Sequence, residues 1–123
     1  MKKILGLDAG LLLTAATFAQ KGVTFTDAVD GYNKTTAQTF HFNMDSNYTL
    51  ESINTNAAFY TSYFTVAATP GTSGTAVAIT LVEDNEMARR VISRFFISLE
   101  AQTISVNGTD MPIFDFMAAY VML

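Results

Sequence analysis

The feature that most constrains the fold is segment 39–45, in which large apolar and polar side chains strictly alternate. Phe40, Phe42 and Met44 take every second position, and the residues between them, including His41, are polar. Because successive side chains of a β-strand point to opposite faces, this alternation predicts a strand with one buried side and one side turned to solvent.

More runs rich in β-branched and aromatic residues follow, bounded by turn residues. We expect strands within segments 22–26, 48–53, 57–69, 75–83 and 103–116. Pro70 and Gly71 start the connection of a hairpin, and Asn107-Gly108 is the preferred pair for a type I′ turn. Pro112 confines its strand to a sheet edge or to a position where no N–H is needed. This spacing predicts a mainly β chain, a single antiparallel β-sandwich or barrel-like domain.

Segment 83–102 allows two readings. Asn85 can cap a helix, and Glu86 and Arg90 are spaced to pair on one helical face. From Arg94 onward, however, apolar and polar residues alternate as they do in a strand. We expect one short helix near 85–92 followed by a strand, and helix or strand stays open for 86–101.

Composition excludes several classes of function. With 123 residues, half of them hydrophobic, the chain is long enough for one well-packed domain. The net charge of −4 offers no basic field for a phosphate backbone, so we expect no nucleic-acid partner. The chain has no cysteine and one histidine, which rules out disulfides and thiolate metal sites and leaves few groups for catalysis.

The first residues have the three parts of a bacterial secretory signal. Lys2 and Lys3 supply positive charge, segment 9–19 is uncharged, and small residues precede a cleavage site between Ala19 and Gln20. We therefore divide the chain into 1–19, a signal peptide or a retained apolar assembly segment, and 20–123, a β-rich domain. Cleavage would make the protein secreted or extracellular, and retention would indicate a virion or another assembled particle.

A retained leader has two alternative structures. It could form a helix that packs on a partner, or a hairpin that turns near Asp8 and Gly10. A helix over 4–19 would reach about 24 Å, which is short of the roughly 30 Å of a bilayer core. We therefore expect no stable membrane span.

No motif for a cofactor, metal or catalytic residue is complete, and we predict none of them. The acidic and amide residues around Asp45 resemble a calcium loop, but Tyr48 stands where that loop requires glycine. An Asx turn at the end of a strand explains the same residues. His41, on the polar side of its strand, is expected to be an exposed surface residue, because no partner motif accompanies it.

The tail 113–123 stays apolar to its last residue, so we expect it to be a buried strand in its own sheet or in that of a neighbour. The predicted function is a non-enzymatic structural subunit of a virion, filament or surface layer that forms homo-oligomers or joins other structural subunits through β-strand and apolar contacts. The assembly residues we expect are Phe114, Phe116, Tyr120, Val121 and Leu123.

Two other hypotheses remain. A secreted or periplasmic β-sandwich could bind a small ligand or glycan, with Tyr48, Tyr60 or Tyr63 in a concave aromatic patch open to solvent. An exported hydrolase would need a close pair of carboxylates, for example Asp45 with Glu51. Nothing in the sequence marks those two residues for that role, so we predict that the protein is not an enzyme.

Overall fold

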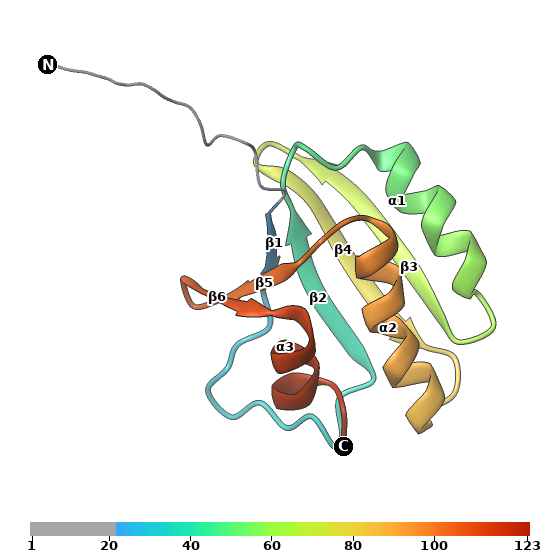
Figure 1. The fold of residues 1–123 in the computed structure, drawn as a ribbon, viewed down its shortest axis with the longest axis vertical. Helices are drawn as coiled ribbons and strands as arrows, with labels where there is room; N and C mark the ends of the chain where they lie inside the picture. Colours follow the sequence, from blue (N-terminus) through green and yellow to red (C-terminus); the bar gives the residue numbers. More distant parts are fainter. Residues whose placement is uncertain (1–21) are drawn as a thin grey trace, which may run out of the picture.

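The computed structural model describes residues 22–123, which form one open six-stranded sheet with three α-helices (Figure 1). The strands lie in the order β3-β4-β2-β1-β5-β6. In chain order the elements are β1 (Val23–Phe25), β2 (Thr39–Met44), α1 (Leu50–Ala57), the 3₁₀ helix η2 (Ala58–Tyr60), β3 (Phe64–Gly71), β4 (Gly74–Leu81), α2 (Glu86–Ser98), β5 (Thr103–Val106), β6 (Thr109–Pro112) and α3 (Ile113–Tyr120).

The prediction of a β-rich chain is confirmed, but the antiparallel sandwich or barrel is wrong. The sheet is single and mixed, because β1 pairs parallel with β5 while all other neighbours are antiparallel. From β2 to β5 the elements follow the β-α-β-β-α-β order of a split βαβ arrangement, with β1 inserted between the first and last of these strands. Helices cover one face, so a second sheet is not needed to bury the core.

The core lies between this face of the sheet and the helices. Phe40, Phe42 and Met44 are at most 1% exposed, which confirms the alternation expected for β2. From α2, Ile92, Phe95 and Phe96 fill the space above them. Burial of each large side chain contributes roughly 1.5–3 kcal/mol, so the packing of α2 on β2 is a major part of the stability.

Helix α2 is longer than expected, and the strand predicted from Arg94 onward is wrong. The Asn85 side chain caps the helix by accepting the Ala88 N–H at 2.8 Å. The other end is a Schellman motif, in which Ala101 N–H bonds the Phe96 carbonyl at 3.0 Å and Glu100 has φ 67°. Both ends are therefore fixed by hydrogen bonds, and the alternation inside the segment does not decide its structure.

Segment 48–53, predicted as a strand, instead begins helix α1. The Thr49 hydroxyl accepts the Ser52 N–H at 3.0 Å and so caps the helix. The following strand, β3, starts at Phe64 rather than at residue 57.

The C-terminal tail is also helical, so the predicted apolar strand is wrong. Helix α3 follows β6 directly, and Ile113, Phe116 and Met117 are its buried residues. The preceding hairpin is confirmed, because Asn107 and Gly108 both have positive φ, 51° and 83°, as a type I′ turn requires.

A buried arginine joins three segments of the chain next to the core. Arg89 of α2 is 0% exposed, and all its N–H donors are used. Nε and one Nη nitrogen bond the Asp84 carboxylate at 2.7 and 3.0 Å. The remaining bonds reach the carbonyls of Lys34, Ala37 and Val121 at 2.9, 2.8 and 2.7 Å. The hydrogen bond from Arg89 holds the pKa of Asp84 below its ordinary value.

Candidate functional site

The face of the sheet opposite the helices presents small and mostly uncharged side chains. We call it the open sheet face, and it consists of Thr24, Thr39, His41, Asn43, Thr65, Ala67, Thr69, Ala76, Ala78, Thr80, Thr103, Ser105 and Asp110. Its titratable side chains are His41 and, on the edge strand β6, Asp110. Large side chains are lacking there, so another surface could approach this face closely.

His41 lies on the open sheet face as predicted, with 51% of its side chain exposed. Asp27 accepts the His41 backbone N–H at 3.0 Å and lies 2.8 Å from Nδ1. A carboxylate only accepts hydrogen bonds, so Nδ1 carries the proton of the neutral ring and Nε2 is its basic nitrogen. Within residues 22–123 no hydroxyl bonds to Nε2, so this pair is not completed as a nucleophilic site.

A hollow of about 170 Å³ lies beside His41 on the open sheet face. Its lining comes from Thr26, just after β1, and from the neighbouring strands β2, β3 and β4, which contribute Phe42, Ala67, Thr69, Ala76, Val77 and Ala78. That volume is below the usual size of a ligand pocket, roughly 300–1,000 Å³. The geometry at His41 therefore favours a contact surface over a small-molecule site.

The two edges of the sheet differ strongly. Strand β6 is four residues long and carries Asp110 and Pro112, which are features that block edge pairing. Strand β3 has eight residues, none of them charged, and β4 is the one strand beside it in the described chain. Its proline, Pro70, stands beside the hairpin turn and leaves 64–69 without a charge or a proline. Such an uncharged edge presents unpaired backbone groups to any extended segment that approaches.

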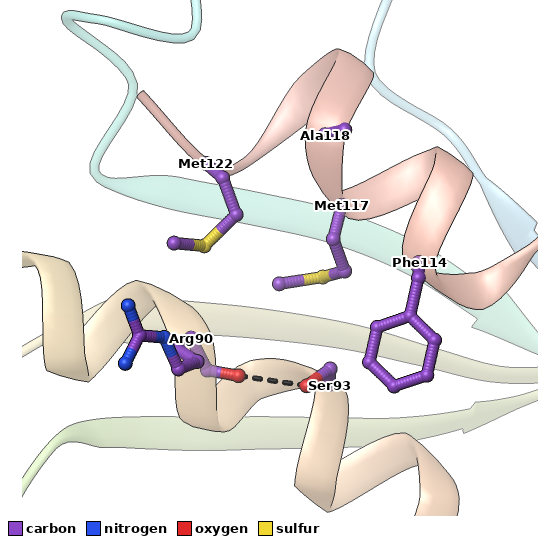
Figure 2. A pocket seen from close by; sticks show the side chains of 6 residues that line it. All are labelled: Arg90, Ser93, Phe114, Met117, Ala118 and Met122. Carbon is purple, nitrogen blue, oxygen red and sulfur yellow. Dashed lines mark hydrogen bonds between the residues drawn. The ribbon is translucent and has the colours of Figure 1, made fainter.

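A second apolar surface lies on the helical side, in the groove between α2 and α3 (Figure 2). The groove has a volume of about 290 Å³ and is lined by Arg90, Ser93, Phe114, Met117, Ala118 and Met122. Phe114 and Arg90 lie at its opposite ends, and both methionines point toward α2 (Figure 2). Methionine side chains adapt readily to different partners, so this lining suits a contact surface.

The predicted assembly residues do not share one environment. Phe116 and Val121 are 0% exposed and belong to the core, whereas Phe114 and Leu123 are 66% and 72% exposed. Tyr120 is partly buried, and its carbonyl accepts the Tyr32 hydroxyl at 2.6 Å. Of the five residues, Phe114 and Leu123 therefore have the exposure that an intermolecular contact needs. The cleavage residues Ala19 and Gln20 lie outside the described residues.

The acidic residues near Asp45 form the expected Asx turn. One Asp45 carboxylate oxygen accepts the Asn47 N–H at 2.9 Å, and the other accepts the Gly22 N–H at 2.6 Å. Both carboxylate oxygens of Asp45 therefore accept hydrogen bonds from the backbone. Among residues 22–123, no three His, Cys, Asp or Glu side chains are grouped so that they could hold a metal ion.

The tyrosines proposed for a ligand site face the protein interior. Tyr48 is 4% exposed, and burial, with the nearby charge of Asp45, raises its pKa to about 12. Tyr60 is partly buried and stacks on Phe64, with the ring centres 5.6 Å apart. Tyr63 is also partly buried against the core. This placement does not favour the concave aromatic patch that the ligand-binding hypothesis expects.

Sequence reasoning missed the edge strand as a candidate site. The signal was present, since segment 64–71 contains no Lys, Arg, Asp or Glu. It could not be interpreted, because nothing local in the sequence shows which strand is outermost in the sheet. Asp27 was likewise not linked to His41, from which it is separated by 14 residues in the chain.

In the part of the chain that the structure describes, no helix has the length and apolar character needed to cross a membrane. No family model, curated protein or solved structure matches this sequence or fold.

Proposed function

We propose that this protein is a non-enzymatic structural subunit that associates with copies of itself through the edge strand β3. The observation that carries the proposal is the contrast between the two edges: β3 has eight uncharged residues with its proline, Pro70, beside the hairpin turn, whereas the four-residue β6 contains both Asp110 and Pro112. Soluble domains usually protect an exposed edge with charges, proline or a bulge. A long uncharged edge is best explained by a partner strand.

A second copy is the partner that best fits this edge. Two antiparallel β3 strands related by a two-fold axis present the same backbone to each other, so the contact needs no second sequence. The two sheets would then continue across the axis. The small side chains Thr65, Ala67 and Thr69 would lie along the junction on the open sheet face and leave room for the strands to approach.

Such a subunit suits an extracellular filament, a surface layer or a virion shell. Secretion with cleavage between Ala19 and Gln20 is part of the proposal, and it rests on the sequence of the leader. The intact mass of the native protein tests it. A mass without residues 1–19 supports export, and a full-length mass supports a particle that keeps the segment.

The edge contact is tested by placing a lysine on β3. Ala67→Lys puts a charge on the exposed edge and, near a two-fold axis, sets two like charges against each other. The matched control is Ala76→Lys, because Ala76 is also exposed on the open sheet face but lies on the interior strand β4. Sedimentation velocity measures association of both variants and of the unmodified protein.

We expect Ala67→Lys to weaken association about tenfold or more and Ala76→Lys to leave it nearly unchanged. Equal weakening by both variants would instead indicate stacking of open sheet faces. Unchanged association in Ala67→Lys would refute β3 as the contact. Circular dichroism spectra confirm that both variants keep the fold.

A further inference from the structure

We infer that Phe114 and the groove beside it form a second contact between copies of this chain, distinct from the β3 edge. Phe114 is 66% exposed although it is a large aromatic residue on the first turn of α3. It lines the groove between α2 and α3 on one side. On its other side it lines a second hollow of about 430 Å³ with Ile97, Glu100, Ala101, Gln102, Pro112 and Ile113.

The proposed contact is two-fold symmetric. Phe114 is a ridge with a hollow on each side, and a two-fold axis beside it places the ridge of each copy in the groove of the other. The groove offers Ala118, which is exposed, and Met122, which is partly buried, as apolar contacts for the incoming ring, with the buried Met117 behind them. Aromatic residues seated in such pockets commonly dominate the energy of an interface.

The charges around the contact are also complementary. Asp115 follows Phe114 on α3 and is exposed, so it would enter the groove region of the second copy together with the ring. The groove ends at Arg90, which pairs with Glu86, and Arg94 is exposed one turn further along α2. Within residues 22–123, Arg94 makes no hydrogen bond or ion pair, so it can take the second copy's Asp115 as its partner.

The size of the surface makes this contact weaker than a permanent interface. A stable dimer buries about 800 Å² on each partner, and Phe114 with the residues around it covers only part of that area. The Phe114 contact therefore gains its effect when another contact already holds copies together. This dependence on another contact rests on the proposed function, because that function supplies the pairing through β3. The Phe114 contact itself does not rest on it.

The two contacts use different parts of the molecule. Strand β3 is one edge of the sheet, and α3 packs over β5 and β6 at the other end (Figure 1). A subunit that pairs through β3 with one copy can therefore bind a different copy through Phe114. Alternation of the two contacts produces an open chain of subunits rather than a closed dimer.

Sedimentation velocity and light scattering on the full-length protein at several concentrations test this inference. The key variant is Phe114→Ser, and its matched control is Phe59→Ser, because Phe59 is 77% exposed on η2, outside the groove. We expect the unmodified protein and Phe59→Ser to form species larger than dimers. Phe114→Ser should stop at dimers, with association at this contact weakened about tenfold or more.

The failure of each proposal is distinguishable. If Phe114→Ser forms the same large species as the unmodified protein, the Phe114 contact is refuted while β3 pairing stands. If Ala67→Lys has no effect but Phe114→Ser yields monomers, β3 pairing is refuted while the Phe114 contact stands. If the unmodified protein stops at dimers and Phe114→Ser does not change them, the groove serves a different occupant, such as an acidic amphipathic helix, and the inference is overturned.

Charge reversal gives a second readout that a loss of folding cannot imitate. Asp115→Arg and Arg94→Glu should each weaken the contact, because each places like charges across the axis. The combined variant restores opposite charges and should recover association. If the combined variant is weaker than either single variant, these two residues do not meet.

Discussion

Arg89→Met tests whether the buried arginine network holds the fold together. Methionine keeps most of the volume of the side chain but removes every hydrogen bond to Asp84, Lys34, Ala37 and Val121. Breaking a buried ion pair by removing one partner costs about 3–5 kcal/mol. The bond to the Val121 carbonyl is buried, and leaving that oxygen without a donor costs about 1–3 kcal/mol of the total.

Partial exposure of the other partners sets the expected value. The Asp84 side chain is 26% exposed and regains some hydration when Arg89 is removed. The carbonyls of Lys34 and Ala37 lie in partly buried bonds that water can replace. We therefore expect a loss of about 3–4 kcal/mol in the free energy of unfolding, near the lower end of the range for a buried pair.

The neighbouring arginine is the matched control. The side chain of Arg90 is 52% exposed and pairs on the helix surface with Glu86, which is 72% exposed. Arg90→Met should therefore cost no more than about 0.5 kcal/mol. Urea unfolding followed by circular dichroism measures both variants. A difference of less than about 1 kcal/mol between the two would refute the structural role assigned to Arg89.

Three further predictions concern pH and backbone geometry. The hydrogen bond from Arg89 lowers the pKa of Asp84, so the contribution of ionised Asp84 to stability is fully present above about pH 3.9 and is lost as the pH falls through the lower pKa of the folded state. Asp84→Asn should therefore reduce the loss of stability at acid pH, as measured by urea unfolding at several pH values. Burial raises the pKa of Tyr32 and Tyr48 from 10.0 to about 12. The stability that these two neutral hydroxyls contribute should be fully present below pH 10 and be lost as the pH rises through 12. Tyrosinate absorbance should then appear together with unfolding. Gly74→Ala should lower the free energy of unfolding by more than about 2 kcal/mol, because φ is 130° and a Cβ would lie 2.3 Å from the Met44 carbonyl oxygen of β2. Gly108→Ala, with φ 83° and open space around the new Cβ, should lower it by about 1 kcal/mol. Thermal unfolding compares the two variants.

The features that sequence reasoning identified correctly are those that depend on neighbouring residues. The alternation of Phe40, Phe42 and Met44 reports one covered face and one open face, and both exist. Asn107-Gly108 sets its turn because both residues adopt positive φ. Asn85 begins the helix near 85–92 by a cap that is visible in the sequence.

The errors come from helices whose local patterns resemble strands. Helix α1 is eight residues long and polar, and its clearest mark is the Thr49 cap. Helix α3 is apolar on most sides, so it lacks the stripe that separates a helix from a buried strand. In both cases packing on the sheet decides the structure, and this packing depends on residues far away in the chain.

Long-range relations in the candidate surfaces could not be predicted for the same reason. The parallel pairing of β1 with β5 joins Thr24 to Ser105, and no local pattern reports it. Arg89 bonds carbonyls 32 to 55 residues away, so its burial contradicts the usual exposure of arginine. The exposed edge of β3 likewise follows from the strand order of the whole sheet.

Amide hydrogen exchange at low and high protein concentration tests the central claim most directly, because it follows the backbone groups of β3 themselves. If two copies pair through this strand, the β3 amides that point away from β4, every second one within 64–69, become more protected as concentration rises, and the amides of 109–111 on the edge strand β6 do not change. Equal exchange of the β3 amides at all concentrations, in a protein that still associates, would contradict the account.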